Sequence, residues 1–374
     1  MKNVYLEASS LAERDEKFVL ATVVNTSGST PQKPGACLLV RSDGSTVGTL
    51  GGGCVEGDIW FAAKEALRHN SEPIYKDYFL NEEIAAQDGL VCGGSMYFYI
   101  EPVLDPSSYT DLTKAISKAY DGVGAVAVAT VVNSNNGNIG KRITILPSGK
   151  AEGTLGNKAL DEEAINSAIS CMPMGKTHRF ETSSGDEIFV VAYTSPPSIL
   201  LIGGGHVNVA TAAIAESVGF RVFVADDRKE FANKDRFPMA EKLFVGPYKD
   251  SVKQFDITPN TAIVVASRGH QFDDVALEKA AETEAGYVGL IGSKRKTLLI
   301  YESMLKNGIS IDRIKSIHAP VGLDLGGRDP SEIAISIVSE ILAWRHGKTG
   351  KSLKIDDGLI ERLVTKNSLS VEIQ

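Results

Sequence analysis

The apolar and polar positions in the first half of the chain follow one pattern that occurs twice. The strand-like segment Ala21–Asn25 returns as Ala129–Asn133 at an offset of 108 residues, and the turn Gly48–Gly51 returns as Gly153–Gly156 at an offset of 105. In each copy, apolar and polar residues first alternate as in a strand, and a glycine turn follows. The apolar residues then recur at helical spacing, and further strand-like segments come after them. We therefore expect two related units, at about residues 15–104 and 123–194, inside one α+β domain that covers residues 1–195.

The segment after the first glycine turn predicts an amphipathic helix. Its charged residues Lys64, Glu65 and Arg68 fall outside an apolar stripe. That stripe consists of Val55, Ile59, Ala62, Ala63, Ala66 and Leu67.

Three glycines and a cysteine, Gly51-Gly52-Gly53-Cys54, stand at the start of this helix. Glycines let backbone N–H groups approach a ligand closely. A helix N-terminus favours a phosphate group and the thiolate form of cysteine. Cys54 is therefore either a reactive or metal-ligating thiol or a small buried apolar residue, as many cysteines are. The stretch taken alone leaves both interpretations open.

The two copies differ at this turn. In register with the shared glycines, Asn157-Lys158-Ala159 replaces Gly52-Gly53-Cys54, and Asp161 replaces Glu56. Features that serve only the fold would be expected in both copies. We therefore predict a binding site in the first copy.

A second difference lies before the last strand of the first copy. Aligning Phe98 with Phe189 lowers the offset to 91, so the first copy carries 14 extra residues around positions 81–94. Cys92 in this stretch either lies against Cys54 or is a cysteine at a strand entry. The predicted site comprises Gly51, Gly52, Gly53, Cys54, Glu56, Cys92 and Gly93.

A polar loop, Asn25–Gly35, precedes the predicted site and is interrupted by prolines. Its hydroxyl groups and Lys33 are suited to a phosphate or an acidic ligand. The alternative is an ordinary solvated loop.

The second half begins with the apolar run Ser198–Ile202, which predicts a buried strand, followed by Gly203-Gly204-Gly205-His206 and a helix. A second strand, Arg221–Ala225, ends at Asp226, about 20 residues after the glycines. This order is the dinucleotide-binding arrangement. Asn208 stands where a third glycine is usual, which predicts altered packing of the helix on the strand. We expect a Rossmann-like domain with a parallel sheet over residues 196–346, and a tail over residues 347–374.

Polar residues follow each predicted strand of this domain. Because ligands bind beyond the carboxyl ends of parallel strands, we expect one nucleotide-binding rim. In this rim Asp226 binds ribose hydroxyls and Arg228 contacts a phosphate. His270 is alternatively a hydrogen-bonded loop histidine, and Lys294 alternatively a solvated residue at a helix start. The candidate residues are Gly203, Gly204, Gly205, His206, Asp226, Arg228, His270, Ser293 and Lys294.

Composition narrows the function classes. The 374 residues carry 39 basic and 47 acidic side chains, a net charge of −8, which argues against a nucleic-acid partner. The four cysteines form no CxxC pair, so neither a zinc ribbon nor a disulfide framework is indicated. We find no signal peptide and no apolar run of membrane-spanning length. A cytoplasmic protein without a membrane partner is therefore expected.

Taken together, these motifs resemble the XdhC/CoxI family of xanthine dehydrogenase accessory factors. The resemblance covers about residues 12–346. It includes Gly51–Glu56, Cys92-Gly93-Gly94, Gly203–Val207, Tyr287–Lys296, Gly322–Gly326 and Glu332-Ile333-Ala334. Many members have a histidine near position 268, where this chain has Arg268, so a family role does not transfer directly to His270.

The resemblance implies a chaperone for molybdenum cofactor (molybdopterin) rather than a catalyst. It implies help from a cysteine desulfurase in cofactor sulfuration, and insertion of the cofactor into a xanthine dehydrogenase-type apoprotein. Cys54 would then contact the molybdenum, since soft ligands suit such centres. The second half would hold a nucleotide, such as the cytidine dinucleotide form of the cofactor or NAD(P). A homodimer is the default oligomer.

Two other function classes are compatible with the pattern. One is an NAD(P)-dependent oxidoreductase with the duplicated half as its substrate domain. It ranks lower because no Tyr-Lys or His-acid set accompanies the glycine motif. The other is a nucleotide-sensing scaffold with inert cysteines.

Overall fold

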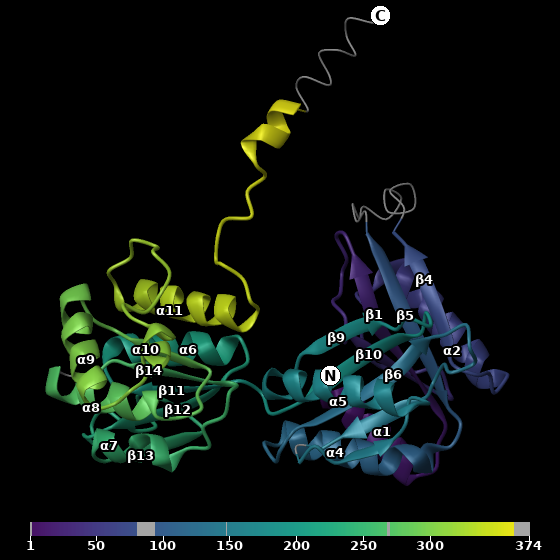
Figure 1. Cartoon of the computed structure of the whole chain (residues 1–374), viewed down its shortest axis with the longest axis horizontal. Helices are drawn as coiled ribbons and strands as arrows, with labels where there is room; N and C mark the ends of the chain where they lie inside the picture. Colours follow the sequence, from purple (N-terminus) through teal and green to yellow (C-terminus); the bar gives the residue numbers. More distant parts are fainter. Residues whose placement is uncertain (1, 81–93, 147, 268–269, 363–374) are drawn as a thin grey trace, which may run out of the picture. The chain divides into compact units, whose positions relative to one another are not determined.

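The computed structural model describes residues 2–80, 94–146, 148–267 and 270–362, without the side chains of residues 270 and 271 (Figure 1). The chain divides into two compact units. The first consists of Met1–Pro197 with Thr258–Asn260, and the second of Ser198–Ile257 with the remainder. Across the residues described, no helix combines the length and hydropathy that a bilayer-crossing segment requires.

The first unit contains two five-stranded sheets with the same strand order, one for each copy of the repeat. The first sheet runs β3-β2-β1-β5-β4 and the second runs β8-β7-β6-β10-β9. The elements of the first copy are α1 (Lys2–Glu13), β1 (Phe18–Ser27), β2 (Cys37–Arg41), β3 (Thr46–Gly48), α2 (Gly53–Arg68), β4 (Ile74–Phe79) and β5 (Ser95–Val103). The connection and the second copy are η1 (Pro106–Tyr109), α4 (Thr110–Tyr120), β6 (Val126–Asn133), β7 (Arg142–Ile145), β8 (Ala151–Gly153), α5 (Lys158–Cys171), η2 (Met172–Met174), β9 (Thr177–Glu181) and β10 (Glu187–Tyr193).

Strand register confirms the duplication and refines its alignment. Ala21 pairs with Ile100 in the first sheet, and Ala129 pairs with Val190 in the second. The last strands are therefore related by an offset of 90 residues, one less than the sequence alignment indicated. In β4 Tyr75 pairs with Tyr99, and in β9 Arg179 pairs with Phe189, the counterpart of Tyr99. Strands β4 and β9 are therefore related by an offset of 104 residues. The fall from 104 to 90 places 14 extra residues between β4 and β5.

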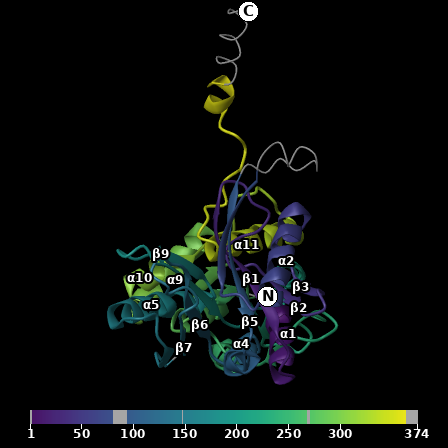
Figure 2. The same ribbon diagram turned by 90° about the vertical axis from the view of Figure 1, so that its right-hand side faces the viewer.

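Each sheet is covered on one face by the helix of its own copy. In the first copy α2 lies against the sheet (Figure 2). Its predicted stripe packs on the strands, and Val55, Ile59, Ala63 and Ala66 of that stripe are buried. In the second copy α5 packs in the same way. The leucine of each shared turn, Leu50 or Leu155, is buried in these cores. Repeated patterning therefore produces repeated packing.

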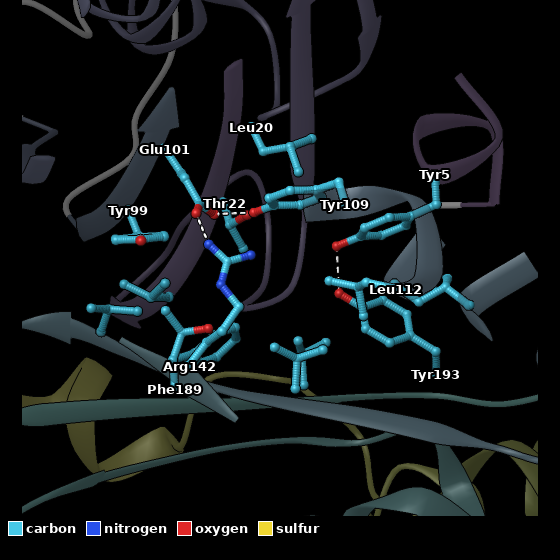
Figure 3. Close-up of a pocket in the computed structure, with 16 residues that line it drawn as sticks. Tyr5, Leu20, Thr22, Tyr99, Glu101, Tyr109, Leu112, Arg142, Phe189 and Tyr193 are labelled. Atoms are coloured by element: carbon cyan, nitrogen blue, oxygen red, sulfur yellow. Dashed lines mark hydrogen bonds and ion pairs between the residues drawn. The ribbon is translucent and has the colours of Figure 1, made fainter. Parts of the chain in front are cut away.

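The other faces of the two sheets meet around a small chamber of about 60 Å³, where a few polar groups lie among apolar side chains. Equivalent residues of the two copies line it, including Thr22 with Thr130 and Tyr99 with Phe189. Arg142 and Glu101 form an ion pair there, and Tyr109 also donates to Glu101 (Figure 3). Neither charge occurs in the other copy, because register makes Cys37 the counterpart of Arg142 and Val191 that of Glu101.

The second unit is a six-stranded parallel sheet in the order β13-β12-β11-β14-β15-β16, the dinucleotide-binding order. Helices α6 and α11 cover one face and α8 and α9 the other (Figure 1). The predicted α/β fold class is confirmed. The elements are β11 (Ser198–Ile202), α6 (His206–Ser217), β12 (Arg221–Asp226), β13 (Lys242–Val245), α7 (Tyr248–Ser251), η3 (Val252–Gln254), β14 (Thr261–Val265), α8 (His270–Ala281), β15 (Tyr287–Leu290), α9 (Lys294–Lys306), α10 (Ile311–Lys315), β16 (Ile317–His318) and α11 (Pro330–Arg345).

Candidate functional site

The glycine turn of the first copy requires glycine for two different reasons. Gly51, Gly52 and Gly53 all have positive φ, at 111°, 75° and 64°. A Cβ on Gly51 would lie 2.6 Å from the Cβ of Pro31, whereas one on Gly52 would meet nothing within 4 Å. Gly51 thus permits close packing of the neighbouring loop. Gly52 keeps the backbone at the start of α2 open.

The Glu56 carboxylate holds this turn together. It accepts hydrogen bonds from Thr49 Oγ1 (2.7 Å) and from the N–H groups of Leu50 (2.7 Å) and Gly52 (3.1 Å). Burial acts to raise the pKa of Glu56, but these hydrogen bonds outweigh it and lower the pKa below its ordinary value. The carboxylate is therefore engaged internally.

The second copy shows that this use of an acid belongs to the fold. Asp161 accepts from Thr154 Oγ1 (2.8 Å) and from the Leu155 N–H (2.7 Å). Glu56 therefore performs a structural task that both copies need. A further role of Glu56 toward a ligand stays a prediction.

The start of the helix differs between the copies. In the second copy the Asn157 side chain caps α5 by accepting from the Leu160 N–H at 2.9 Å. In the first copy Gly52 occupies the cap position, and no side-chain cap is found among the described residues. Cys54 follows in the first turn of α2 and is exposed, so it is not the small buried residue that the sequence also allowed.

Two other segments of the first copy border this turn. Pro31 packs on Gly51, and a Cβ on Gly94 would lie 2.6 Å and 2.5 Å from the carbonyl oxygens of Ser27 and Ser29. The loop after β1 is three residues longer than its counterpart, because the offset falls from 108 to 105 across it. Gly94 ends the 14-residue insertion. Gly94 and the longer loop after β1 thus lie together at one end of the first sheet, while Cys92 and Gly93 lie outside the described residues.

Two cavities open at the turn. One, of about 330 Å³, lies between the loop after β1 and the residues Gly48 and Thr49, and Lys33 lines it. The other, of about 290 Å³, lies between Gly53, Glu56 and Trp60. The first cavity combines a cation, the hydroxyl group of Thr49 and glycine backbone, a set that suits an anionic ligand.

The other described cysteines are packed away from solvent. Cys37 and Cys171 are buried in the two copies. Burial raises the pKa of Cys37 to about 11 and also raises that of Cys171. Of the three thiols in the described ranges, Cys54 alone is exposed. No group of three or more His, Cys, Asp or Glu side chains within those ranges is arranged to hold a metal ion.

The glycine turn of the second unit is tightly packed at its first two positions. A Cβ on Gly203 would lie 2.2 Å from the Ala266 carbonyl oxygen, and one on Gly204 would lie 2.2 Å from that of Phe231. A Cβ on Gly205 would meet nothing within 4 Å. The open approach to this turn is therefore at Gly205 and at the exposed His206 that begins α6.

Asn208 explains why a third glycine is not needed. Its buried amide donates to the carbonyl oxygens of Gly203 (2.7 Å) and Ile202 (3.4 Å). The side chain thus ties α6 to the strand through hydrogen bonds where other sequences achieve close packing with glycine. The sequence signalled this difference, but only the structure shows the bonds.

Asp226, the predicted ribose ligand, is fully buried. Its carboxylate accepts from the Gly204 N–H at 2.7 Å and from the N–H and Nε of Arg228 at 2.9 Å and 3.0 Å. Arg228 also stacks over Phe231 at 3.5 Å. The two side chains therefore satisfy each other in this structure, and their roles toward ribose and phosphate stay predictions.

The remaining rim residues lie at the ends of β14 and β15. Ser293 caps α9 by accepting from the Lys296 N–H, and Lys294 is exposed beside it. The side chain of His270 at the start of α8 lies outside the described part. Asp273 of α8 is buried and accepts from the Ser267 N–H at 2.9 Å. It also pairs with Lys296, a contact that the sequence did not indicate. This pair ties the loop after β14 to α9.

Known proteins resemble this chain along most of its length. Residues 11–76 match the XdhC and CoxI family, and residues 199–341 match the XdhC Rossmann domain. A Bacillus subtilis protein, named as a probable subunit of xanthine dehydrogenase, is 27% identical over 92% of this chain and 98% of its own length. An Escherichia coli protein named "Molybdenum cofactor insertion chaperone PaoD" is 22% identical over 87% of this chain and 83% of its own length.

Two further relatives extend the comparison. The chain is 26% identical to the Escherichia coli protein YqeB over 93% of this chain, but it spans only 47% of that longer relative. A crystal structure described as a xanthine dehydrogenase from Bacillus halodurans superposes with a TM-score of 0.64 at 25% identity. It covers 93% of this chain and 98% of the other.

Proposed function

Because this chain belongs to the XdhC and CoxI family, we propose that it is an accessory factor of a xanthine dehydrogenase-type molybdoenzyme. In this proposal it binds molybdenum cofactor, supports sulfuration of the cofactor by a cysteine desulfurase, and inserts the cofactor into the apoprotein. The names of the Bacillus subtilis relative and of the insertion chaperone support this direction.

The observation that carries the proposal is the convergence of features found only in the first copy. The uncapped start of α2, the exposed Cys54 and the enlarged loop with Lys33 border one end of one sheet. The second copy has the same fold without them, so the fold does not explain them.

The residues present fit such a cofactor. Molybdopterin carries a phosphate, and a helix N-terminus together with a lysine suits a phosphate. The Gly51 and Gly52 N–H groups donate to Thr49 and Glu56 in this structure, so a phosphate would take over these hydrogen bonds. When bound, the cofactor supplies a soft metal centre, for which a thiolate is a suitable ligand. We assign the phosphate end to Gly51, Gly52, Gly53 and Lys33, and the metal end to Cys54 with Cys92 and Gly93.

We further propose that the second unit binds a nucleotide at Gly205 and His206. The strand order of this unit and the open position at Gly205 support this role. The alternative of an NAD(P)-dependent oxidoreductase uses the same residues but needs a hydride acceptor or donor in the first unit.

A transplant of the second copy's turn into the first copy tests cofactor binding. The triple variant Gly52→Asn, Gly53→Lys, Cys54→Ala gains a helix cap worth about 1 kcal/mol. This gain opposes the strain of placing Asn and Lys at two positions with positive φ, so the melting temperature of the variant is measured beside its cofactor content. We expect its molybdenum-to-protein ratio, measured by metal analysis after co-expression with cofactor synthesis, to fall at least 10-fold. Activation of the target enzyme should fall with it.

The reciprocal variant is the matched control. Asn157→Gly, Lys158→Gly, Ala159→Cys places the site sequence in the second copy and should not raise the molybdenum content. If the first variant keeps its melting temperature, its molybdenum content and its activation of the target enzyme, the turn does not take part in cofactor binding.

A further inference from the structure

The second unit contains a cavity of about 480 Å³ that none of the sequence motifs indicated. It lies where β12 and β13 end and α8 begins, which is the edge at which parallel sheets bind ligands. Its lining residues are Asp227, Gly246, Pro247, Tyr248, Lys249, Phe272 and Val275.

Apolar side chains form one part of this cavity. The rings of Tyr248 and Phe272 lie 5.7 Å apart at 66°. Phe272 is 37% exposed and Val275 is 41% exposed, although both face a concave surface. A flat, partly apolar ring can stack on such side chains and remove them from water.

An acidic group forms another part. The buried Asp226 is occupied by Gly204 and Arg228, but the next residue, Asp227, is half-buried and lines the cavity. The Tyr248 hydroxyl donates to Asp227 at 3.3 Å, and Arg228 Nε lies 3.5 Å from it. A carboxylate held in this way can accept hydrogen bonds from the two hydroxyls of a ribose.

The cavity is connected to the glycine turn through the backbone. Asp226 Oδ2 lies 2.7 Å from the Gly204 N–H, so Asp227, one residue later, is held beside the turn. Gly205 is the open position of that turn and precedes the N-terminus of α6. A ligand with its ring in the cavity would therefore direct its 5′ phosphates toward a helix start suited to them.

We propose that this cavity binds the nucleoside of a ribonucleoside diphosphate. The base packs against Tyr248, Phe272 and Val275, and the ribose hydroxyls donate to Asp227 rather than to Asp226. Asp227 disfavours a phosphate at the 2′ position of the ribose, and Arg228 is already paired with Asp226. Lys249 also lines the cavity and is the cation that a 2′ phosphate would meet, so the comparison of NAD+ with NADP+ decides between the two charges. This rests on the nucleotide role proposed for the second unit and not on cofactor binding by the first.

Calorimetric titration of the full chain tests the proposal. The probes are ADP, CDP, NAD+ and NADP+. Binding of ADP with NAD+ would identify an adenine nucleotide, and binding of CDP would identify a cytidine nucleotide. We expect NADP+ to bind at least 10-fold more weakly than NAD+. Asp227→Asn and Phe272→Ala should each raise the Kd of the bound probe at least 10-fold.

Matched controls are Asp235→Asn, an exposed acid of the same unit, and Leu298→Ala, an apolar residue of α9 that is 68% exposed. Neither should change the Kd. Gly205→Asp places an acid at the phosphate end and should abolish binding.

The outcomes separate the two levels of the proposal. Binding that is lost in Gly205→Asp but unchanged in both cavity variants would keep the nucleotide role and remove the cavity. No binding of any probe to wild type would remove both.

Photo-crosslinking with 8-azido-ADP, or with 5-azido-CDP where CDP is the bound probe, gives a second test that does not depend on variants. Label should fall on peptides that contain Tyr248 or Phe272, and label confined to other peptides would overturn the cavity assignment.

Discussion

At the scale of single residues, residues of the same type have different roles according to their burial and contacts. Cys37 and Cys54 lie only 17 positions apart, yet one is packed in the core of the first copy and the other is exposed at a helix start. Glu56 resembles a site residue in sequence, but its carboxylate has the same structural task as Asp161. A residue type therefore indicates chemistry only together with its contacts.

The thiols give a prediction at this scale. In a Cys92→Ser background, Cys54 should react with iodoacetamide in the native protein at pH 7.5 at least ~100-fold faster than Cys37. Burial shields Cys37 and raises its pKa to about 11, which lowers its thiolate fraction by about two powers of ten. Mass spectrometry of timed samples measures both rates.

Denaturant provides the control for this measurement, since all thiols should react alike in 6 M guanidinium. Modification of Cys37 as fast as that of Cys54 in the native protein would contradict the burial argument.

At the scale of elements, one carboxylate joins α11 to the last two strands of the parallel sheet. Glu340 accepts from Tyr287 of β15 (2.6 Å) and from the Gly322 N–H (2.8 Å), and it lies 3.1 Å from His318 of β16. Burial acts to raise its pKa, but the bonds from His318, Tyr287 and Gly322 lower the pKa to about 2. The charged form thus holds the helix on the sheet.

The pH dependence follows from this lowered pKa. A carboxylate with a depressed pKa stabilises the fold above its unfolded pKa near 4.5 and loses that contribution as pH falls toward 2. We expect the second unit to lose about 2 kcal/mol more in wild type than in Glu340→Gln between pH 5 and pH 2.5. Trp344, which packs on Tyr287, reports urea unfolding of this unit in a Trp60→Phe background. Parallel pH curves for the two proteins would show that Glu340 contributes nothing in this window.

At the scale of the whole first unit, two similar halves are joined through one asymmetric contact. The chamber between the sheets is lined by equivalent residues, but only one copy supplies Arg142 and only the other supplies Glu101 (Figure 3). Arg142 also lies 4.7 Å from the ring of Tyr109. Removing one partner leaves a mostly buried charge without its counter-ion, which is costly.

Exchange of the pair for the residues of the opposite copy tests this contact. Glu101→Val alone should destabilise the first unit by about 3 kcal/mol, because Arg142 loses its carboxylate. The double variant Glu101→Val, Arg142→Cys should cost at least about 1 kcal/mol less than the sum of the single changes. Urea unfolding followed by Trp60 in a Trp344→Phe background measures the coupling. Strictly additive effects would show that the pair is not coupled.

The sequence alone determined the features that depend on local spacing. The duplication, the glycine turns and the parallel second half follow from periodicity and from short motifs, because neighbouring residues decide strand, turn and helix. Comparison of the two copies along the chain also placed the candidate site at Gly52, Gly53 and Cys54.

Only the tertiary structure decided which side chains meet. Asp226 is buried against Gly204 while Asp227 lines a cavity, although the two are neighbours in the chain. Arg142 and Glu101 pair across two sheets from positions 41 residues apart. Burial and pairing depend on the packing of distant segments, and periodicity along the chain carries no information about that packing.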